Sequence, residues 1–274
     1  MTVAAIPAFA QDDHADLTTR SNPVGVCNSP SDPAIQALAA RLSQSMSAAY
    51  RTRRVNWIGV QVTDRATGIS CGISQHRRTE VASVDKVAIV ASLLYKHQRA
   101  GQSRLRGAER SWARAAIMQS DNDAAGKLFH AAGGQPGLAR FEHAARMIET
   151  RLDPSGYWGD TRSSAVGQVS LMQALTSDSV LHAPQRNYLL GLMRHVSGDQ
   201  RWGIGAGARG ASVIAIKDGW GTRPRRSWRV NSIGNVHNRS HDYNIALMSD
   251  GNPTEQYGIR TISAIARSIN SVLR

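Results

Sequence analysis

Segments with the two-residue periodicity of strands lie only towards the two ends of this chain, and a long stretch of helical pattern separates them. The strand-like segments are 57–62, 69–73, 211–217, 228–236 and 243–249. Between them, residues 106–208 are rich in Ala, Leu, Met and Gln at helical spacing, with loops at 133–134 and 156–159. Because short turns connect the neighbouring strands at each end, we expect antiparallel pairing.

Three further segments have the apolar spacing of amphipathic helices. One begins at Asp32-Pro33, one runs from Val84 to about His97, and one spans 255–273. The order predicts an α/β (α+β) fold: an antiparallel five-stranded sheet flanked by N- and C-terminal helices, with an all-helical subdomain inserted between strands two and three. The corresponding division is an α/β part at 23–75 and 209–274 and a helical part at 76–208.

Composition excludes several classes of protein. The chain has 274 residues, of which 41% are hydrophobic and 19% charged, so it is not a disordered chain. Two cysteines exclude a disulfide-dense scaffold and any four-cysteine zinc module. No apolar run approaches 18 residues, so we expect no transmembrane helix.

The N-terminal 22 residues differ from the rest. Ala8-Phe9-Ala10 resembles a signal-peptide cleavage site after a short apolar run, and a polar stretch continues to Pro23. We interpret 1–22 as a truncated leader and flexible arm; a merely disordered N-terminus is the alternative. An exported protein could join Cys27 to Cys71, whereas two buried free thiols are the other reading.

The net charge of +13 comes almost wholly from arginine, because only four of the 33 basic residues are lysine. The arginines are scattered, and the densest cluster, Arg223, Arg225, Arg226 and Arg229 around Trp228, accompanies no nucleic-acid-binding motif. We therefore expect a solvated basic surface with no specific nucleic-acid partner.

Ser83-Val84-Asp85-Lys86 puts a hydroxyl and an amine three residues apart at the start of a predicted helix, on one face of it. A neutral lysine in that position can take the serine proton and turn a weak nucleophile into an acylatable one. The structural alternative is an N-cap serine beside a surface lysine.

Ser120-Asp121-Asn122 follows within the helical segment. Ser120 could relay a proton to a leaving group, and Asn122 could hydrogen-bond a substrate amide. An ordinary cap before the next helix is the alternative.

Lys217-Asp218-Gly219 closes the predicted strand 211–217. A lysine there could keep the field beside the serine positive and hold an anionic substrate group. The glycine would let a substrate backbone approach the strand edge. A strand-end lysine before a turn is the alternative.

These three elements occur in the order S-x-x-K, S-D-N, K-T-G of serine β-lactamases and penicillin-binding proteins. The chain resembles the class A serine β-lactamases, within the penicillin-recognising serine hydrolases, over most of residues 30–274. Further segments carry the resemblance: 120–125 is similar to the family's S-D-N-T-A-A, 133–138 to its G-G-P-x-x-L, and 150–153 to the T-R-L-D that opens its omega loop.

The resemblance implies acyl transfer with Ser83 as nucleophile, Lys86 as base, and Ser120 and Lys217 polarising and relaying protons. The backbone N–H groups of Ser83 and Trp220 would hold the oxyanion. It implies no cofactor and no metal. The residues it assigns to substrate binding are Asn122, Asp218, Gly219 and Trp220.

Two departures from the family pattern alter that expectation. The segment 153–160 holds no glutamate, although in class A enzymes an omega-loop Glu positions the deacylating water; Asp153 or Asp160 could substitute. In the third motif Asp218 replaces Thr or Ser, and an aspartate would repel a substrate carboxylate unless neutralised by Lys217 or the arginine cluster. From the missing glutamate we expect slow deacylation, and from Asp218 a substrate that is neutral, cationic or a peptide rather than a penicillin.

The sequence thus predicts a secreted, monomeric serine hydrolase that forms an acyl-enzyme on Ser83 with a β-lactam or related amide or ester. The alternatives are acyl transfer on peptidoglycan peptides, as in a DD-peptidase, an esterase, or a non-hydrolytic ligand-binding protein on the same fold. The histidines suggest no zinc site: His237 and His241 are four residues apart but lie in a loop. A basic polyanion binder is supported by charge alone.

Overall fold

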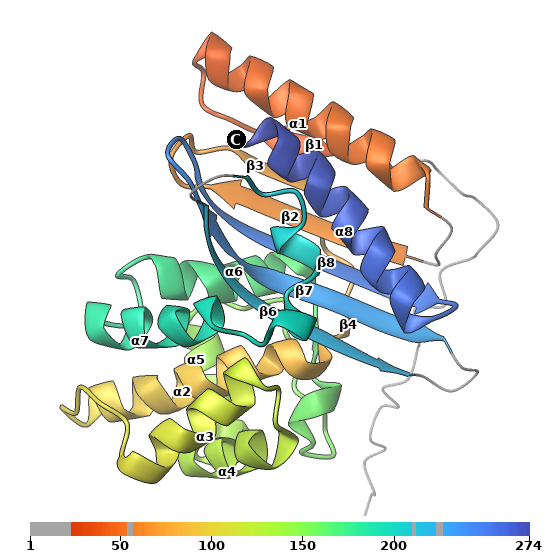
Figure 1. Cartoon of the computed structure of the whole chain (residues 1–274). Coiled ribbons are helices and arrows are strands. Elements are labelled where there is room, and N and C mark those ends of the chain that lie inside the picture. Colours follow the sequence, from red (N-terminus) through yellow and green to blue (C-terminus); the bar gives the residue numbers. More distant parts are fainter. Residues whose placement is uncertain (1–22, 54–56, 210–211, 223–226) are drawn as a thin grey trace, which may run out of the picture.

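The computed structural model describes residues 23–53, 57–209, 212–222 and 227–274 (Figure 1). The predicted leader and arm at 1–22 lie outside the described residues. So do Ala211, at the start of a predicted strand, and three members of the arginine cluster, Arg223, Arg225 and Arg226.

A six-stranded sheet in the order β1-β3-β2-β8-β7-β6 forms the centre of the α/β half, and every neighbouring pair is antiparallel. The strands are β1 (Val26–Asn28), β2 (Trp57–Asp64), β3 (Ser70–Ile73), β6 (Val213–Thr222), β7 (Trp228–His237) and β8 (Asp242–Asn252). The five predicted strands are all present. The sixth, β1, was not predicted, because three residues are too few to display a periodicity.

The terminal helices α1 (Pro33–Arg51) and α8 (Glu255–Val272) lie side by side over one face of the sheet (Figure 1). Asp32 Oδ1 caps α1 by accepting from the N–H groups of Ala34 and Ile35 at 2.8 and 3.0 Å. The predicted apolar stripe of α8 faces inwards, where Ile262, Ile265 and Ile269 are fully buried. The predicted flanking of the sheet by the terminal helices is therefore confirmed.

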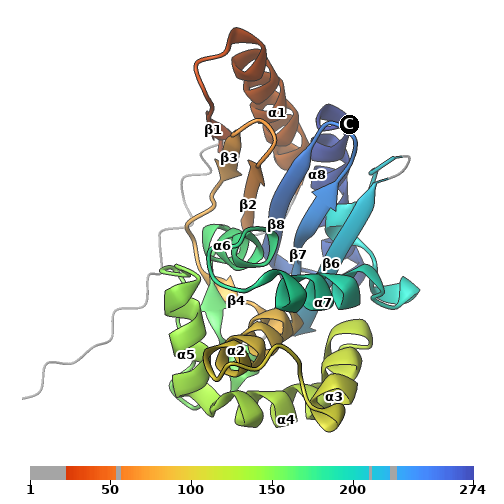
Figure 2. The ribbon, with the colours of Figure 1, turned by 90° about the vertical axis from the view of Figure 1, so that its left-hand side faces the viewer.

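The helical half is inserted between β3 and β6 and lies against the opposite face and one end of the sheet (Figure 2). Its helices are α2 (Asp85–Arg99), α3 (Gly107–Met118), α4 (Asn122–Ala132), α5 (Gly134–Ala144), α6 (Ala165–Thr176) and α7 (Ala183–Arg194). Every residue of α2 from Asp85 to Leu94 is buried, so this helix forms the centre of the half. α6 packs directly on the sheet through β2, β7 and β8.

A small two-stranded ribbon, β4 (Thr79–Glu80) with β5 (Arg162–Ser163), links the two halves. It closes a short loop, residues 152–161, whose ends are joined by two backbone hydrogen bonds between Arg151 and Arg162, 2.7 and 2.9 Å long. The N–H of Val81 donates to Thr161 O at 2.9 Å. The 152–161 loop is consequently held against the chain that leads to Ser83.

Cys27 and Cys71 form a disulfide that joins β1 to β3 at the sheet edge, which decides between the two predicted states of these cysteines. None of the helices in the described part of the chain is long and apolar enough to cross a membrane.

Candidate active site

Ser83 lies on a one-turn 3-10 helix, η1 (Ala82–Val84), that runs directly into α2. Ala82 has a left-handed backbone with φ of 52°, a conformation that costs energy in a non-glycine residue and often marks a functional turn. Strand β6 packs against this turn so closely that a Cβ on Gly219 would lie 2.8 Å from Ser83 N. Glycine is therefore required at Gly219 for the strand to approach Ser83.

Lys86, one turn into α2, is fully buried beside Ser83. Its Nζ lies 2.8 Å from Ser83 Oγ and donates to Ser120 O at 2.5 Å and Asn122 Oδ1 at 2.7 Å. A neutral amine has two N–H groups and one lone pair. The two carbonyl oxygens use the N–H groups, which leaves the lone pair for the Ser83 hydroxyl.

Ser120 joins the two lysines of the site. Its Oγ is 3.1 Å from Lys86 Nζ and 3.0 Å from Lys217 Nζ, and Lys217 also donates to Asp218 O at 2.9 Å. Ser120 too has a left-handed backbone, with φ of 59°. The strained turn between α3 and α4 thus holds a hydroxyl between two amines that come from different elements.

The electrostatics favour an uncharged amine. Burial, together with the charge of Lys217, lowers the pKa of Lys86 to about 7, although Asp121 opposes the shift. Burial also lowers the pKa of Lys217 to about 8, against the opposing charge of Asp218. No carboxylate of the described residues forms a hydrogen bond or ion pair with Lys86.

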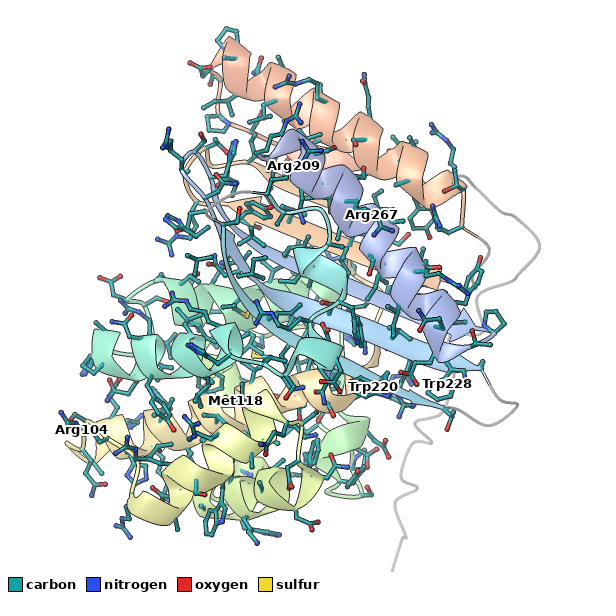
Figure 3. All side chains as sticks on the ribbon, in the orientation of Figure 1. Arg104, Met118, Arg209, Trp220, Trp228 and Arg267 are labelled. Carbon is teal, nitrogen blue, oxygen red and sulfur yellow. A yellow bond between two sulfur atoms is a disulfide. The ribbon has the colours of Figure 1, made fainter. Side chains whose placement is uncertain are left out.

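The remaining sequence-predicted residues do not all face this cluster. Asn122 is exposed with its Oδ1 held by Lys86, and Gly219 contacts the Ser83 turn. Trp220, labelled in Figure 3, lies at the end of the sheet nearest the helical half. Its ring packs edge-on against Trp202, with centroids 5.8 Å apart.

Asp218 is the exception. Side chains alternate along a strand, so Asp218 points away from the face that carries Lys217. Its fully buried carboxylate accepts from Trp202 N at 3.1 Å, and burial raises its pKa well above the usual range. The expectation that Asp218 stands where a hydroxyl would meet a substrate carboxylate does not fit this orientation. Its contact holds Trp202 instead.

Neither aspartate of the 152–161 loop contacts Ser83 or Lys86. Asp153 Oδ2 accepts from Ser155 N at 2.8 Å, within the loop itself. Asp160 lies 3.9 Å from Arg229 Nη2, and its side chain is 47% exposed. Neither has the geometry of a base that faces the nucleophile.

Three neighbours of the site were missed by sequence reasoning. The indole of Trp158 lies over Lys86, with the ring centroid 5.3 Å from Nζ. Asn231 Nδ2 donates to Glu80 O and Val81 O at 3.0 and 3.2 Å and so ties β7 to the chain before Ser83. Asp85, inside the first motif, is fully buried, and burial raises its pKa to about 7. Only the unusual buried charge within the motif could have been noticed from sequence.

The comparisons with known proteins point to one family. The Beta-lactamase enzyme family matches residues 109–273, a range that includes Ser120 and Lys217 but not Ser83 and Lys86. That match covers more than half of the sequence. The chain belongs to the β-lactamase enzyme family. No curated protein sequence matches it.

Solved structures agree with this membership at the level of the fold. A class A β-lactamase representative from Bacteroides cellulosilyticus superposes with a TM-score of 0.74 at 14% identity, covering 86% of this chain and 98% of that one. β-Lactamases from Xanthomonas campestris and Burkholderia vietnamiensis give TM-scores of 0.72 at 19% and 18% identity. They are covered over 99% and 95% of their lengths, and cover 86% and 84% of this chain. This member of the family thus has the class A fold.

Within the described residues, no group of three or more His, Cys, Asp or Glu side chains is arranged to hold a metal ion.

Proposed function

We propose that this member of the β-lactamase family is a serine hydrolase that forms an acyl-enzyme on Ser83 with a β-lactam or a related amide or ester. The observation that carries the proposal is the position of Lys86 Nζ, 2.8 Å from Ser83 Oγ, in surroundings that lower its pKa to about 7. An amine that is substantially neutral near pH 7 can accept the serine proton, which a fully charged ammonium cannot.

In the acylation step the Ser83 proton moves to Lys86 Nζ as Oγ forms a bond to the carbonyl carbon. The C–N or C–O bond of the substrate then breaks, and the leaving atom takes its proton from Ser120 Oγ. Lys86, 3.1 Å away, returns a proton to Ser120. Lys217 remains the neighbouring cation, so its charge compensates the negative charge that develops in the transition state.

The oxyanion is held by the backbone N–H groups of Ser83 and Trp220. The close packing of Gly219 against Ser83 supports this pairing, because it brings the end of β6 beside the turn that carries the nucleophile. Asn122, whose Oδ1 is held by Lys86, presents its Nδ2 to a substrate amide. Asn122, Gly219 and Trp220 form the substrate side of the site, with Asp218 supporting Trp202 behind it.

Deacylation is slow in this proposal, because Asp153 and Asp160 do not contact the site. The same observation favours a second candidate: a ligand-binding protein that is acylated and does not turn over. A cell-wall peptide or an ester are further substrates that the acyl-transfer chemistry would accept.

The broader setting is also proposed. The Cys27–Cys71 disulfide supports an extracytoplasmic location, because such bonds persist in oxidising compartments. We further propose a monomer without a nucleic-acid partner. Its leader and arm would end near residue 22, and its α/β part (23–75 and 209–274) would enclose a helical part at 76–208.

The test is incubation with a fluorescent penicillin followed by intact-mass measurement, with Ser83→Ala as the control. The expected result is one covalent adduct on the wild type and none on the variant. Turnover of a chromogenic cephalosporin that is lost in Ser83→Ala would add hydrolysis to acylation. Absence of an adduct with β-lactam, ester and peptide probes alike would refute the nucleophile assignment.

A further inference from the structure

The 152–161 loop places the indole ring of Trp158 over Lys86 of the candidate active site. Trp158 is only 8% exposed, although it lies in a short connection between helices. It stands on a one-turn 3-10 helix, η2 (Trp158–Asp160), and packs against the ring of Tyr157 with centroids 5.5 Å apart. The Arg151–Arg162 and Val81–Thr161 hydrogen bonds hold the loop ends, so the position of the indole is fixed by the fold.

The contacts of Lys86 leave little room for water. Ser83 Oγ, Ser120 O and Asn122 Oδ1 occupy the three hydrogen-bonding directions of a neutral amine, and the Trp158 ring covers a further side. Lys86 itself has no exposed surface. A closed apolar face of this kind excludes solvent from the groups behind it.

Hydrolysis of an acyl-enzyme needs a water molecule, and the groups around Lys86 hinder its access. The water oxygen must bond to the acyl carbon while a base takes its proton, and the bond from the acyl carbon to Ser83 Oγ then breaks as Oγ regains a proton. With no carboxylate of the described residues paired to it, Lys86 is the base that remains for this water. Water must therefore reach hydrogen-bonding distance of Nζ, and Trp158 covers one approach.

We infer that Trp158 is a positioning residue that separates the two half-reactions, leaving Lys86 free to take the Ser83 proton during acylation while closing it to deacylating water. This inference rests on the proposed acyl-enzyme at Ser83. Two consequences follow if the indole is removed: water enters beside Lys86, and the amine becomes better hydrated. The adduct should then hydrolyse faster, and acylation should require a higher pH, because hydration favours the charged ammonium.

The experiment measures both half-reactions in Trp158→Ala and Trp158→Phe. The adduct half-life is followed by intact mass after removal of excess fluorescent penicillin, and the acylation rate is measured from pH 5.5 to 9. The wild type should show an acylation midpoint near pH 7, as expected from the pKa of Lys86. Trp158→Ala should shorten the adduct half-life by about tenfold or more and move the midpoint upwards; Trp158→Phe, which keeps an aromatic face, should remain near the wild type.

Trp112→Ala is the matched control, since Trp112 is a half-buried indole over another lysine, Lys127, with 5.8 Å from the ring centroid to Nζ. It should leave both measurements unchanged. If Trp158→Ala does not fold, Trp158→Leu provides the test, with the same directions of change expected. If folded Trp158 variants have the same adduct half-life and the same acylation midpoint as the wild type, this inference is overturned and the proposed function is not. A wild type that forms no adduct overturns the proposed function and this inference with it.

Discussion

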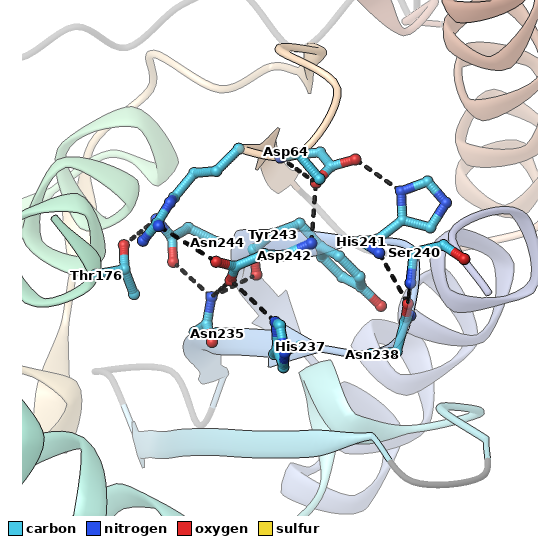
Figure 4. A network of polar contacts seen from close by, with 12 residues as sticks. Asp64, Thr176, Asn235, His237, Asn238, Ser240, His241, Asp242, Tyr243 and Asn244 are labelled. Atoms are coloured by element: carbon cyan, nitrogen blue, oxygen red, sulfur yellow. Dashed lines mark hydrogen bonds and ion pairs between the residues drawn. The ribbon is translucent and has the colours of Figure 1, made fainter.

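Two buried polar networks lie on the same sheet, one near each end, and they handle charge in opposite ways. At the end away from Ser83, Asp64 is fully buried and accepts four hydrogen bonds, two of them from His241 and Asp242 (Figure 4). The donors are Ala66 N at 3.1 Å, Thr67 Oγ1 at 2.7 Å, His241 Nδ1 at 2.7 Å and Asp242 N at 3.1 Å. Through these contacts the network fastens the turn between β2 and β3 to the β7–β8 turn.

The network around Lys86 lacks that compensation. Two lysines share Ser120 Oγ, and the buried carboxyl of Asp85, the residue before Lys86, forms no ion pair within the described residues, with a hydrogen bond from Thr161 only partly opposing the effect of burial. Burial without an opposite charge favours the neutral forms, which is why the pKa of Lys86 falls and that of Asp85 rises. The difference indicates two uses of a buried charge. Asp64, with four hydrogen bonds, stabilises the fold, whereas Lys86, buried without a paired carboxylate, can exchange a proton near neutral pH.

Lys86→Arg should have the largest effect on the network around Ser83. A guanidinium stays charged at any working pH and cannot take the Ser83 proton, so acylation should fall by about a thousandfold or more. The measurement is the rate of adduct formation with fluorescent penicillin, alongside urea unfolding to verify the fold. Retention of more than a tenth of the wild-type rate would contradict the role of Lys86 as base.

Asp64→Asn tests the other network. It removes the charge that His241 and the two turns face, and the free energy of unfolding should fall by about 3 kcal/mol, as is typical when one partner of a buried pair is lost. Urea denaturation gives the change, and the acylation rate of the folded protein should stay within about twofold. A large loss of acylation without loss of stability would show that the two ends of the sheet are coupled.

Asp85→Asn should have the smallest effect, and one that depends on pH. Because its folded pKa is raised to about 7, Asp85 contributes stability that is fully present below pH 4 and is lost as pH rises through 7. The variant has no carboxyl at this position and does not lose this stability. Its free energy of unfolding, relative to that of the wild type, should therefore be about 2 kcal/mol higher at pH 8.5 than at pH 4.5. Urea unfolding at both pH values measures the difference, and parallel behaviour of the two proteins would exclude a protonated Asp85.

Periodicity was enough to predict the arrangement of the fold. The five longer strands, the flanking helices and the inserted helical half all follow from the spacing of apolar residues, because these are the residues that the fold buries. β1 was not predicted, because its three residues are held by a disulfide and by pairing with β3, and neither interaction leaves a pattern in the local sequence.

The three short motifs brought the lysines and hydroxyls of the site to attention. The structure joins them in a chain of hydrogen bonds that runs from Ser83 through Lys86 and Ser120 to Lys217. The orientation of Asp218 could have been anticipated, since strand alternation directs it away from the face of Lys217. Trp158 could not, because its place over Lys86 depends on how a loop closes between distant elements.

The position of β1 has a practical consequence. β1 and β6 are the opposite edge strands of the sheet, and the site is built at the β6 side. An affinity tag, a dye or a solid support attached ahead of β1 therefore joins the protein at an edge that four strands separate from β6. The disulfide to β3 would transmit any pull on that attachment into the sheet. The molecule can thus be immobilised at the edge of the sheet opposite the site for single-molecule or surface-based measurements of acylation.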